Sequence, residues 1–158
     1  MIVREMQCAD TPALTSLLLG LCGIDRYRRF CRPACDRMVC DYVERIDWAE
    51  SVVLGAFDCA ARLMGIVEIC HAGRNAELAL AVARPHRRQG VGRALLECAL
   101  LHARAMGKEA VVLTCRVDNL AMRQLAQNTG LIVDSAHASA DDADEPAASN
   151  IVYASALR

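Results

Sequence analysis

The chain has 158 residues, of which 54% are hydrophobic and 23% charged, and its formal net charge is -1. A chain of this length can bury a sizeable core, so we expect one domain over residues 1–158. Its apolar runs stay well below the roughly 20 residues that a bilayer requires, and its near-neutral charge argues against general nucleic-acid binding. We therefore expect neither a membrane nor a nucleic acid among its partners.

The first residues and the cysteines indicate a cytoplasmic protein without a metal. The start, MIVREMQCAD, lacks a basic segment followed by an apolar one, so we predict no export signal. Nine cysteines at irregular spacing fit a reduced compartment better than a disulfide framework. The tightest group, Cys31, Cys35 and Cys40, contains no C-x-x-C pair and has no histidine pair nearby, so we predict no zinc site.

The amino-terminal half contains five predicted elements. In chain order they are a strand at Met1–Met6, helices at Ala13–Leu21 and Cys35–Ile46, and strands at Ser51–Phe57 and Ala61–Cys70. Thr11 and Pro12 mark the start of the first helix, because a capping residue followed by proline suits the first turn. The last two strands meet at a short polar turn around Asp58, which is typical of a hairpin.

The carboxy-terminal half contains six predicted elements. They are a strand at Ala76–Arg84, a helix that stops at Gly107, a strand at Ala110–Cys115, a helix at Asn119–Gln127, and strands at Leu131–Ala136 and Asn150–Ser155. Pro85 ends the first of these strands. Between the last two strands, Ser139–Ser149 is predicted to be a mobile acidic loop. This order predicts an α+β fold in which helices cover the faces of a sheet.

Two glycines, Gly90 and Gly92, stand directly before a run that repeats like a helix. A helix start offers unpartnered N–H groups and a partial positive charge, which favours phosphate. Glycine lacks a Cβ atom, so an anion can approach its backbone closely. Arg87, Arg88 and Arg93 add positive charge there. The combination suits a pyrophosphate, although a connecting turn explains the glycines alone equally well.

Two other phosphate-binding loops fit this stretch less well. A P-loop needs Gly-Lys-Ser/Thr, which is absent here, and a dinucleotide fingerprint needs a third glycine where Leu95 stands. Neither motif therefore explains the loop.

The whole stretch from Ala76 to Gly107 resembles the core of the GNAT superfamily, the Gcn5-related N-acetyltransferases. The family motif Arg/Gln-x-x-Gly-x-Gly/Ala appears as Arg87–Gly92, and strand, proline turn, loop and helix stand in the family's order. Downstream, Asp118–Val133 resembles the family's closing segment, with Leu131 in place of the usual aromatic residue. The resemblance implies a mixed, mostly antiparallel sheet of about six to seven strands with four helices on its faces.

In this family the motif amides bind the pyrophosphate of acetyl-CoA. The strand before the motif parts from its parallel neighbour, and the pantetheine arm pairs with the exposed edge. Carried over by position, the expected cofactor contacts are Leu80, Val82, Arg87, Arg88, Gln89, Gly90, Val91, Gly92, Arg93 and Asn119. Core packing is the alternative explanation for Leu80 and Val82, and a helix cap is the alternative for Asn119.

Transfer of an acetyl group to an amine needs a base, since an alkyl ammonium has a pKa of about 10.4. The strand AELALAV resembles that of the bacterial protein-lysine acetyltransferase branch, in which the glutamate is the proposed base. This resemblance assigns the role to Glu77, and a solvated carboxylate at a strand end is the alternative. Glu68 ranks second, because a carboxylate inside an apolar strand must point to water, a partner or a cleft.

Many family members carry a tyrosine that protonates the departing thiolate, and Ala126 stands at that position here. Water could substitute, since an unprotonated thiolate at pH 7 costs only about 2 kcal/mol. Tyr153 on the last predicted strand is more simply explained as a packed or surface residue.

A second resemblance lies nearer the amino terminus. Asp25–Phe30 and Ile46–Trp48 resemble segments of the same bacterial branch, in a region that borders the acceptor cleft. Tyr27, Arg28 and Arg29 would then help to select the substrate. The alternative is a solvated basic helix face with the phenylalanine packed inward.

Together the resemblances imply a single cytoplasmic acetyltransferase domain over residues 1–158. It would move the acetyl group of acetyl-CoA to a primary amine, on a protein lysine or a small molecule, by direct attack in a ternary complex. The alternative is an acyl-CoA binding or sensing domain without significant catalysis. Homodimers formed through the last strands are common in this superfamily.

Overall fold

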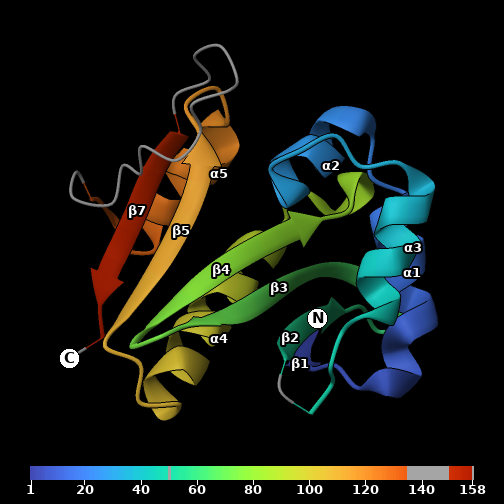
Figure 1. The fold of residues 1–158 in the computed structure, drawn as a ribbon, viewed down its shortest axis with the longest axis horizontal. Helices are drawn as coiled ribbons and strands as arrows, with labels where there is room; N and C mark the ends of the chain where they lie inside the picture. Colours follow the sequence, from blue (N-terminus) through green and yellow to red (C-terminus); the bar gives the residue numbers. More distant parts are fainter. Residues whose placement is uncertain (50, 135–149, 158) are drawn as a thin grey trace.

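The computed structural model describes residues 1–49, 51–134 and 150–157 and is shown in Figure 1. In chain order its elements are β1 (Ile2–Glu5), α1 (Thr11–Leu19), α2 (Gly23–Phe30), α3 (Asp36–Glu44), β2 (Val52–Phe57), β3 (Leu63–Ala72), β4 (Asn75–Val82), α4 (Val91–Ala105), β5 (Ala110–Arg116), α5 (Leu120–Asn128), β6 (Ile132–Val133) and β7 (Asn150–Ala156), with short 3-10 helices at Cys8–Asp10 and Arg84–His86.

The described strands form one sheet in the order β1-β2-β3-β4-β5-β7-β6. Every neighbouring pair is antiparallel except β4 and β5, which run parallel. This confirms the predicted mixed, mostly antiparallel α+β sheet. The parallel pair is short, because it extends only from Asn75 to Glu77 on β4. Beyond Glu77 the two strands diverge, and a gap opens between them toward α2 and α5 (Figure 1).

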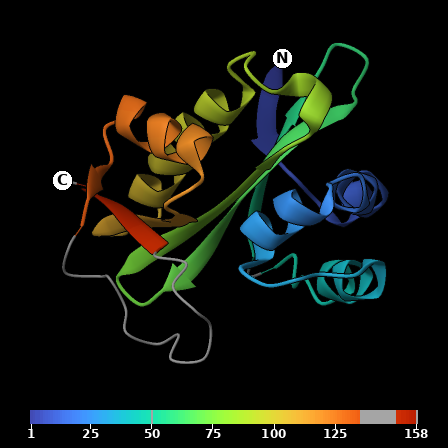
Figure 2. The same ribbon diagram turned by 90° about the horizontal axis from the view of Figure 1, so that it is seen from above.

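Helices cover both faces of the sheet, as Figure 2 shows: α4 and α5 lie on one side, and α1, α2 and α3 on the other. Successive side chains of a strand point to opposite faces, so each strand feeds two cores. On β3, Val67 belongs to the core under α4, whereas Ile66 belongs to the core under α1 and α3. Both side chains are fully buried.

The prediction of four helices was wrong, because the described residues form five α-helices. The additional helix is α2, whose sequence GIDRYRRF contains three arginines and one aspartate and buries only Arg29. Periodicity detects a helix through its buried apolar face, so a helix held by charged side chains gives no such signal. It supplies three residues, Asp25, Arg28 and Arg29, to the lining of the larger cavity of the site.

Two other predictions concern the end of the chain. β6 is shorter than the predicted strand Leu131–Ala136, although residues 135 and 136 lie outside the described residues. The predicted acidic loop Ser139–Ser149 also lies outside them. Within the described part of the chain, no helix combines the length and the apolar character needed to cross a bilayer.

Candidate functional site

A cavity of about 500 Å³, the central cavity, lies beside the gap between β4 and β5. It is lined by Leu21, α2, the end of β4, the loop before α4, and α5 with its capping residue. Eight of the ten predicted cofactor contacts line it: Leu80, Val82, Arg87, Arg88, Gly90, Gly92, Arg93 and Asn119. The other two do not. The Gln89 side chain donates to the carbonyl of Pro85, and Val91 is buried in the core.

The edge of β4 forms one wall of the central cavity. Leu80, Ala81 and Val82 all line it, although their side chains alternate between the two faces of the sheet. The shared feature is the backbone edge, which no longer pairs with β5 after Glu77. The side chains of Leu80 and Val82 also pack against the core under α4. Core packing therefore explains the side chains of Leu80 and Val82. Their backbone edge still lies beside the cavity.

The glycine loop brings the first turn of α4 to the cavity. Gly90 is the residue before the helix and has φ 81°, a conformation that side chains disfavour. Gly92 lies close to α5, where an added Cβ atom would come within 3.2 Å of Leu125. Geometry therefore favours glycine at position 90 through its positive φ, and at position 92 a larger residue would press on the Leu125 side chain. The amino terminus of a 15-residue helix, with its partial positive charge, faces the same space.

Arg87 is engaged by other protein groups. Its Nε donates to the carbonyl of Val82 at 3.0 Å and its Nη2 to Asp25 Oδ2 at 2.8 Å. Burial alone would raise the pKa of Asp25, but hydrogen bonds from Arg87 and the Cys22 thiol hold it below its ordinary value. The sequence marked Asp25 only as the first residue of the segment Asp25–Phe30, and its pairing with Arg87, 62 positions away, has no local signal.

Glu68 is held by two groups. Its Oε2 accepts hydrogen bonds from Arg29 Nη2 at 2.5 Å and from the Tyr42 hydroxyl at 2.6 Å. The guanidinium also donates to the tyrosine oxygen at 2.8 Å. Burial raises the pKa of Tyr42 far above its ordinary value, so this hydroxyl stays protonated. Arg29 is 9% exposed, so the expectation of a solvated basic face is wrong for this residue.

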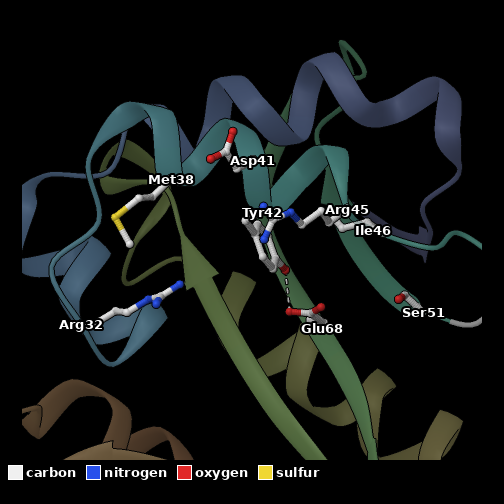
Figure 3. Close-up of a pocket in the computed structure, with 8 residues that line it drawn as sticks. All are labelled: Arg32, Met38, Asp41, Tyr42, Arg45, Ile46, Ser51 and Glu68. Carbon is white, nitrogen blue, oxygen red and sulfur yellow. Dashed lines mark hydrogen bonds between the residues drawn. The ribbon is translucent and has the colours of Figure 1, made fainter.

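A second, smaller cavity of about 280 Å³, the α3 pocket, lies between α3 and the sheet (Figure 3). It is lined by Arg32, Met38, Asp41, Tyr42, Arg45, Ile46, Ser51 and Glu68. Figure 3 shows Tyr42 pointing from α3 toward Glu68 on β3. Arg29, their common partner, lines the central cavity. The three side chains therefore stand between the two cavities. The sequence did not identify Tyr42 as a member of this cluster.

Glu77 lies at the last register position at which β4 still pairs with β5. It is exposed, and it stands directly opposite Cys70 of β3. The side-chain alternation puts it on the sheet face covered by α1, α2 and α3, together with Glu68. It belongs to the lining of neither cavity. Burial, followed by the nearby Glu68 carboxylate, raises the pKa of the Cys70 thiol to about 11.

The start of α5 confirms the capping interpretation of Asn119, whose Oδ1 accepts a hydrogen bond from the Met122 amide at 3.3 Å. Asn119 also lines the central cavity. Ala126 is fully buried in the core under α4 and does not line the cavity. Tyr153 is buried in the same core, and its hydroxyl has no hydrogen-bond partner among the described residues.

No cysteine among the described residues forms a disulfide, and Cys31, Cys35 and Cys40 lie at the end of α2, before α3 and within α3. Residues 1–49, 51–134 and 150–157 contain no group of three His, Cys, Asp or Glu side chains placed to hold a metal ion.

Solved structures share this fold over nearly the whole chain. The GNAT domain of S. lividans PAT has a TM-score of 0.80 and 21% identity, over 98% of this chain and 89% of that one. Ribosomal-protein-alanine N-acetyltransferase from Brucella melitensis has a TM-score of 0.76 and 17% identity, over 99% and 100%. Spermidine N-acetyltransferase from Vibrio cholerae, in complex with CoA and spermine, has a TM-score of 0.73 and 18% identity, over 97% and 92%.

A search of curated proteins by sequence found no match. The sequence model of the Acetyltransferase (GNAT) family matches residues 24–131, which run from α2 to the residue before β6 and include the whole lining of the central cavity after Leu21. By this match, which covers more than half of the sequence, the chain belongs to the GNAT family of acetyltransferases.

Proposed function

We propose that residues 1–158 form one acetyltransferase domain that moves the acetyl group of acetyl-CoA to a primary amine in the cytoplasm. The observation that carries the proposal is the central cavity, where the unpaired edge of β4 meets the glycine loop before α4. An extended amide chain can pair with such an edge, and a pyrophosphate suits such a helix start. Acetyl-CoA contains both groups.

The charge of the central cavity supports an anionic cofactor. Five arginines line it, at positions 28, 29, 87, 88 and 93, and the one carboxylate among its described lining residues is Asp25. Asp25 is paired with Arg87, and Arg29 with Glu68. Among the described residues, Arg93 pairs only with Glu97 of its own helix, and both side chains are exposed. Arg88, Arg93 and the amides from Gly90 onward are therefore the proposed phosphate contacts.

We assign the base to Glu77. Deprotonating an alkyl ammonium at pH 7 costs about 4 to 5 kcal/mol, so a carboxylate beside the amine assists the attack. Glu77 is exposed and lies where the gap between β4 and β5 begins. Glu68 is less suited, because Arg29 and Tyr42 both occupy its Oε2. A proton taken by Glu77 passes on to solvent.

Direct attack by the amine is favoured over an acetyl-cysteine intermediate. The cysteine opposite Glu77 is Cys70, and its pKa of about 11 keeps the thiol protonated at neutral pH. A protonated thiol is a poor nucleophile. Ala126 supplies no acid for the leaving thiolate, so water serves, at a cost of about 2 kcal/mol.

The acceptor is a protein lysine or a small amine. The alternative function is an acyl-CoA sensor without significant catalysis, which the buried alanine at position 126 favours. Coenzyme A release from acetyl-CoA with a panel of amines and lysine peptides separates the two. Release that depends on an amine supports the transferase, and binding without release supports the sensor.

Isothermal titration with CoA and dephospho-CoA tests the binding site itself, and the absence of binding to either contradicts both functions. A homodimer through the last strands is also part of the proposal. Its support is the exposed β6 at the edge of the sheet, where Ile132 is 72% and Val133 54% exposed. Sedimentation velocity tests the dimer.

A further inference from the structure

Helix α2 is fastened along one face by two ion pairs of opposite polarity. Asp25 accepts a hydrogen bond from Arg87, which follows β4 in the chain. One helical turn later, Arg29 donates to Glu68 of β3. Residues four positions apart lie on the same side of a helix. The two pairs therefore clamp this face of α2 over β3 and the end of β4.

A different part of α2 reaches across the gap to β5. The guanidinium of Arg28 lies 4.0 Å from the carboxylate of Asp118. The Arg116 guanidinium lies over the Tyr27 ring, with 5.3 Å between its Cζ and the ring centroid. Helix α2 therefore has contacts on both sides of the gap.

The charge of Asp25 alone would disfavour the binding of an anionic cofactor. The Asp25 side chain is 13% exposed and lines a cavity proposed to hold a pyrophosphate, which a carboxylate repels. Its partner Arg87 also donates to Val82, so two of its guanidinium nitrogens, Nε and Nη2, are already engaged by protein groups. Arg93 differs, because its ion pair with Glu97 lies along its own helix.

We propose that Asp25 and Arg87 are positioning residues that set the binding of the acceptor and not that of acetyl-CoA. They hold α2 in place as the wall between the central cavity and the α3 pocket. The same helix carries Arg29, which lines the first cavity while its partners Glu68 and Tyr42 line the second. This inference rests on the proposed function and deepens it, since it assigns the Arg87 side chain to the acceptor side.

The test compares Asp25→Asn, Asp25→Glu and Arg87→Gln with Arg88→Gln as the matched control. We expect Asp25→Asn and Arg87→Gln to raise the acceptor KM about tenfold while the Kd for CoA stays within about threefold. The conservative Asp25→Glu keeps the acceptor KM near the wild-type value. Arg88→Gln shows the reverse pattern, with CoA binding weakened about tenfold. The double variant Asp25→Asn with Arg87→Gln resembles either single variant, because one broken pair cannot be broken again.

Hydrogen exchange gives a readout that does not depend on turnover. Asp25→Asn and Arg87→Gln accelerate exchange of the α2 amides about tenfold relative to those of α4, and Arg88→Gln leaves them unchanged. Two results would overturn the inference. One is that Arg87→Gln weakens CoA binding as much as Arg88→Gln does. The other is that Asp25→Asn keeps both the wild-type acceptor KM and the wild-type exchange rate of the α2 amides. Wild-type protein that binds no CoA overturns the proposed function instead, and titration detects that result separately.

Discussion

The Arg29 guanidinium and the Glu68 carboxylate form an ion pair of 2.5 Å in which the side chains are 6% and 13% exposed. The pair joins α2 to β3, and Tyr42 of α3 binds to both members. Three elements far apart in the sequence thus meet at one buried polar cluster. Removing one partner of such a pair leaves an unpaired buried charge, which typically costs about 3 to 5 kcal/mol.

We therefore expect Glu68→Gln to lower the free energy of unfolding by about 3 kcal/mol, because Arg29 loses its counter-charge. Urea unfolding measures this change. The control combines Glu68→Met and Arg29→Met with Tyr42→Phe, which removes both charges and the hydroxyl that they hold and regains most of the loss. A single variant as stable as the wild type would show that the pair contributes nothing to folding.

The stability should depend on pH through Asp25. Its pKa lies below the ordinary value, so in acid the folded chain binds fewer protons there than the unfolded chain. The carboxylate stabilises the fold above the unfolded pKa of about 3.9, and the contribution disappears as the pH falls through the folded pKa. Asp25→Asn is then less stable than the wild type at pH 6, and the two converge below about pH 4. Thermal unfolding across this range checks the convergence.

Cys70 should be dispensable for turnover. Because its pKa is about 11, the thiol is protonated at neutral pH and forms no acetyl-enzyme. Cys70→Ala should keep the wild-type rate of CoA release within about twofold, and intact mass spectrometry of wild-type protein with acetyl-CoA should show no acetyl adduct on this residue. An adduct that an amine then removes would replace direct attack with a two-step mechanism.

Tyr153 offers a test of a buried hydroxyl. The side chain is fully buried, and its oxygen has no partner among the described residues. Since an unsatisfied buried polar group costs about 1 to 3 kcal/mol, Tyr153→Phe should leave stability unchanged or raise it by about 1 kcal/mol. Its rate of CoA release should match the wild type. A lost rate with intact folding would instead identify this tyrosine as the acid that Ala126 does not provide.

The sequence predicted the elements that carry strong local signals. The glycine loop, the proline after β4 and the apolar spacing of α4 were all read correctly, because turns and amphipathic helices are encoded within a few residues. The mixed, mostly antiparallel sheet and the family also followed from the resemblance. The gap between β4 and β5 was predicted only from the resemblance to the family. No residue pattern within either strand indicates it.

The contacts of α2 could not be predicted in the same way. Asp25 and Arg87 are 62 positions apart in the sequence, and Arg29 and Glu68 are 39 apart. Charged residues usually indicate a solvated surface, so a pattern of arginines and one aspartate predicted no burial. Only the packing of α2 against β3 and β4 turns these residues into partners.

Glu77→Gln should lower kcat/KM for the acceptor about 10²- to 10⁴-fold, the usual contribution of a positioned base. CoA binding should be unchanged, because Glu77 does not line the central cavity. Rates measured from pH 6 to 9 should show the largest deficit near neutrality and a smaller one at high pH, where more of the amine is already neutral. Glu109→Gln is the matched control, since that carboxylate is 60% exposed and paired with Arg74 just before β5. Full turnover by the Glu77 variant across this range would remove the residue from the chemical step.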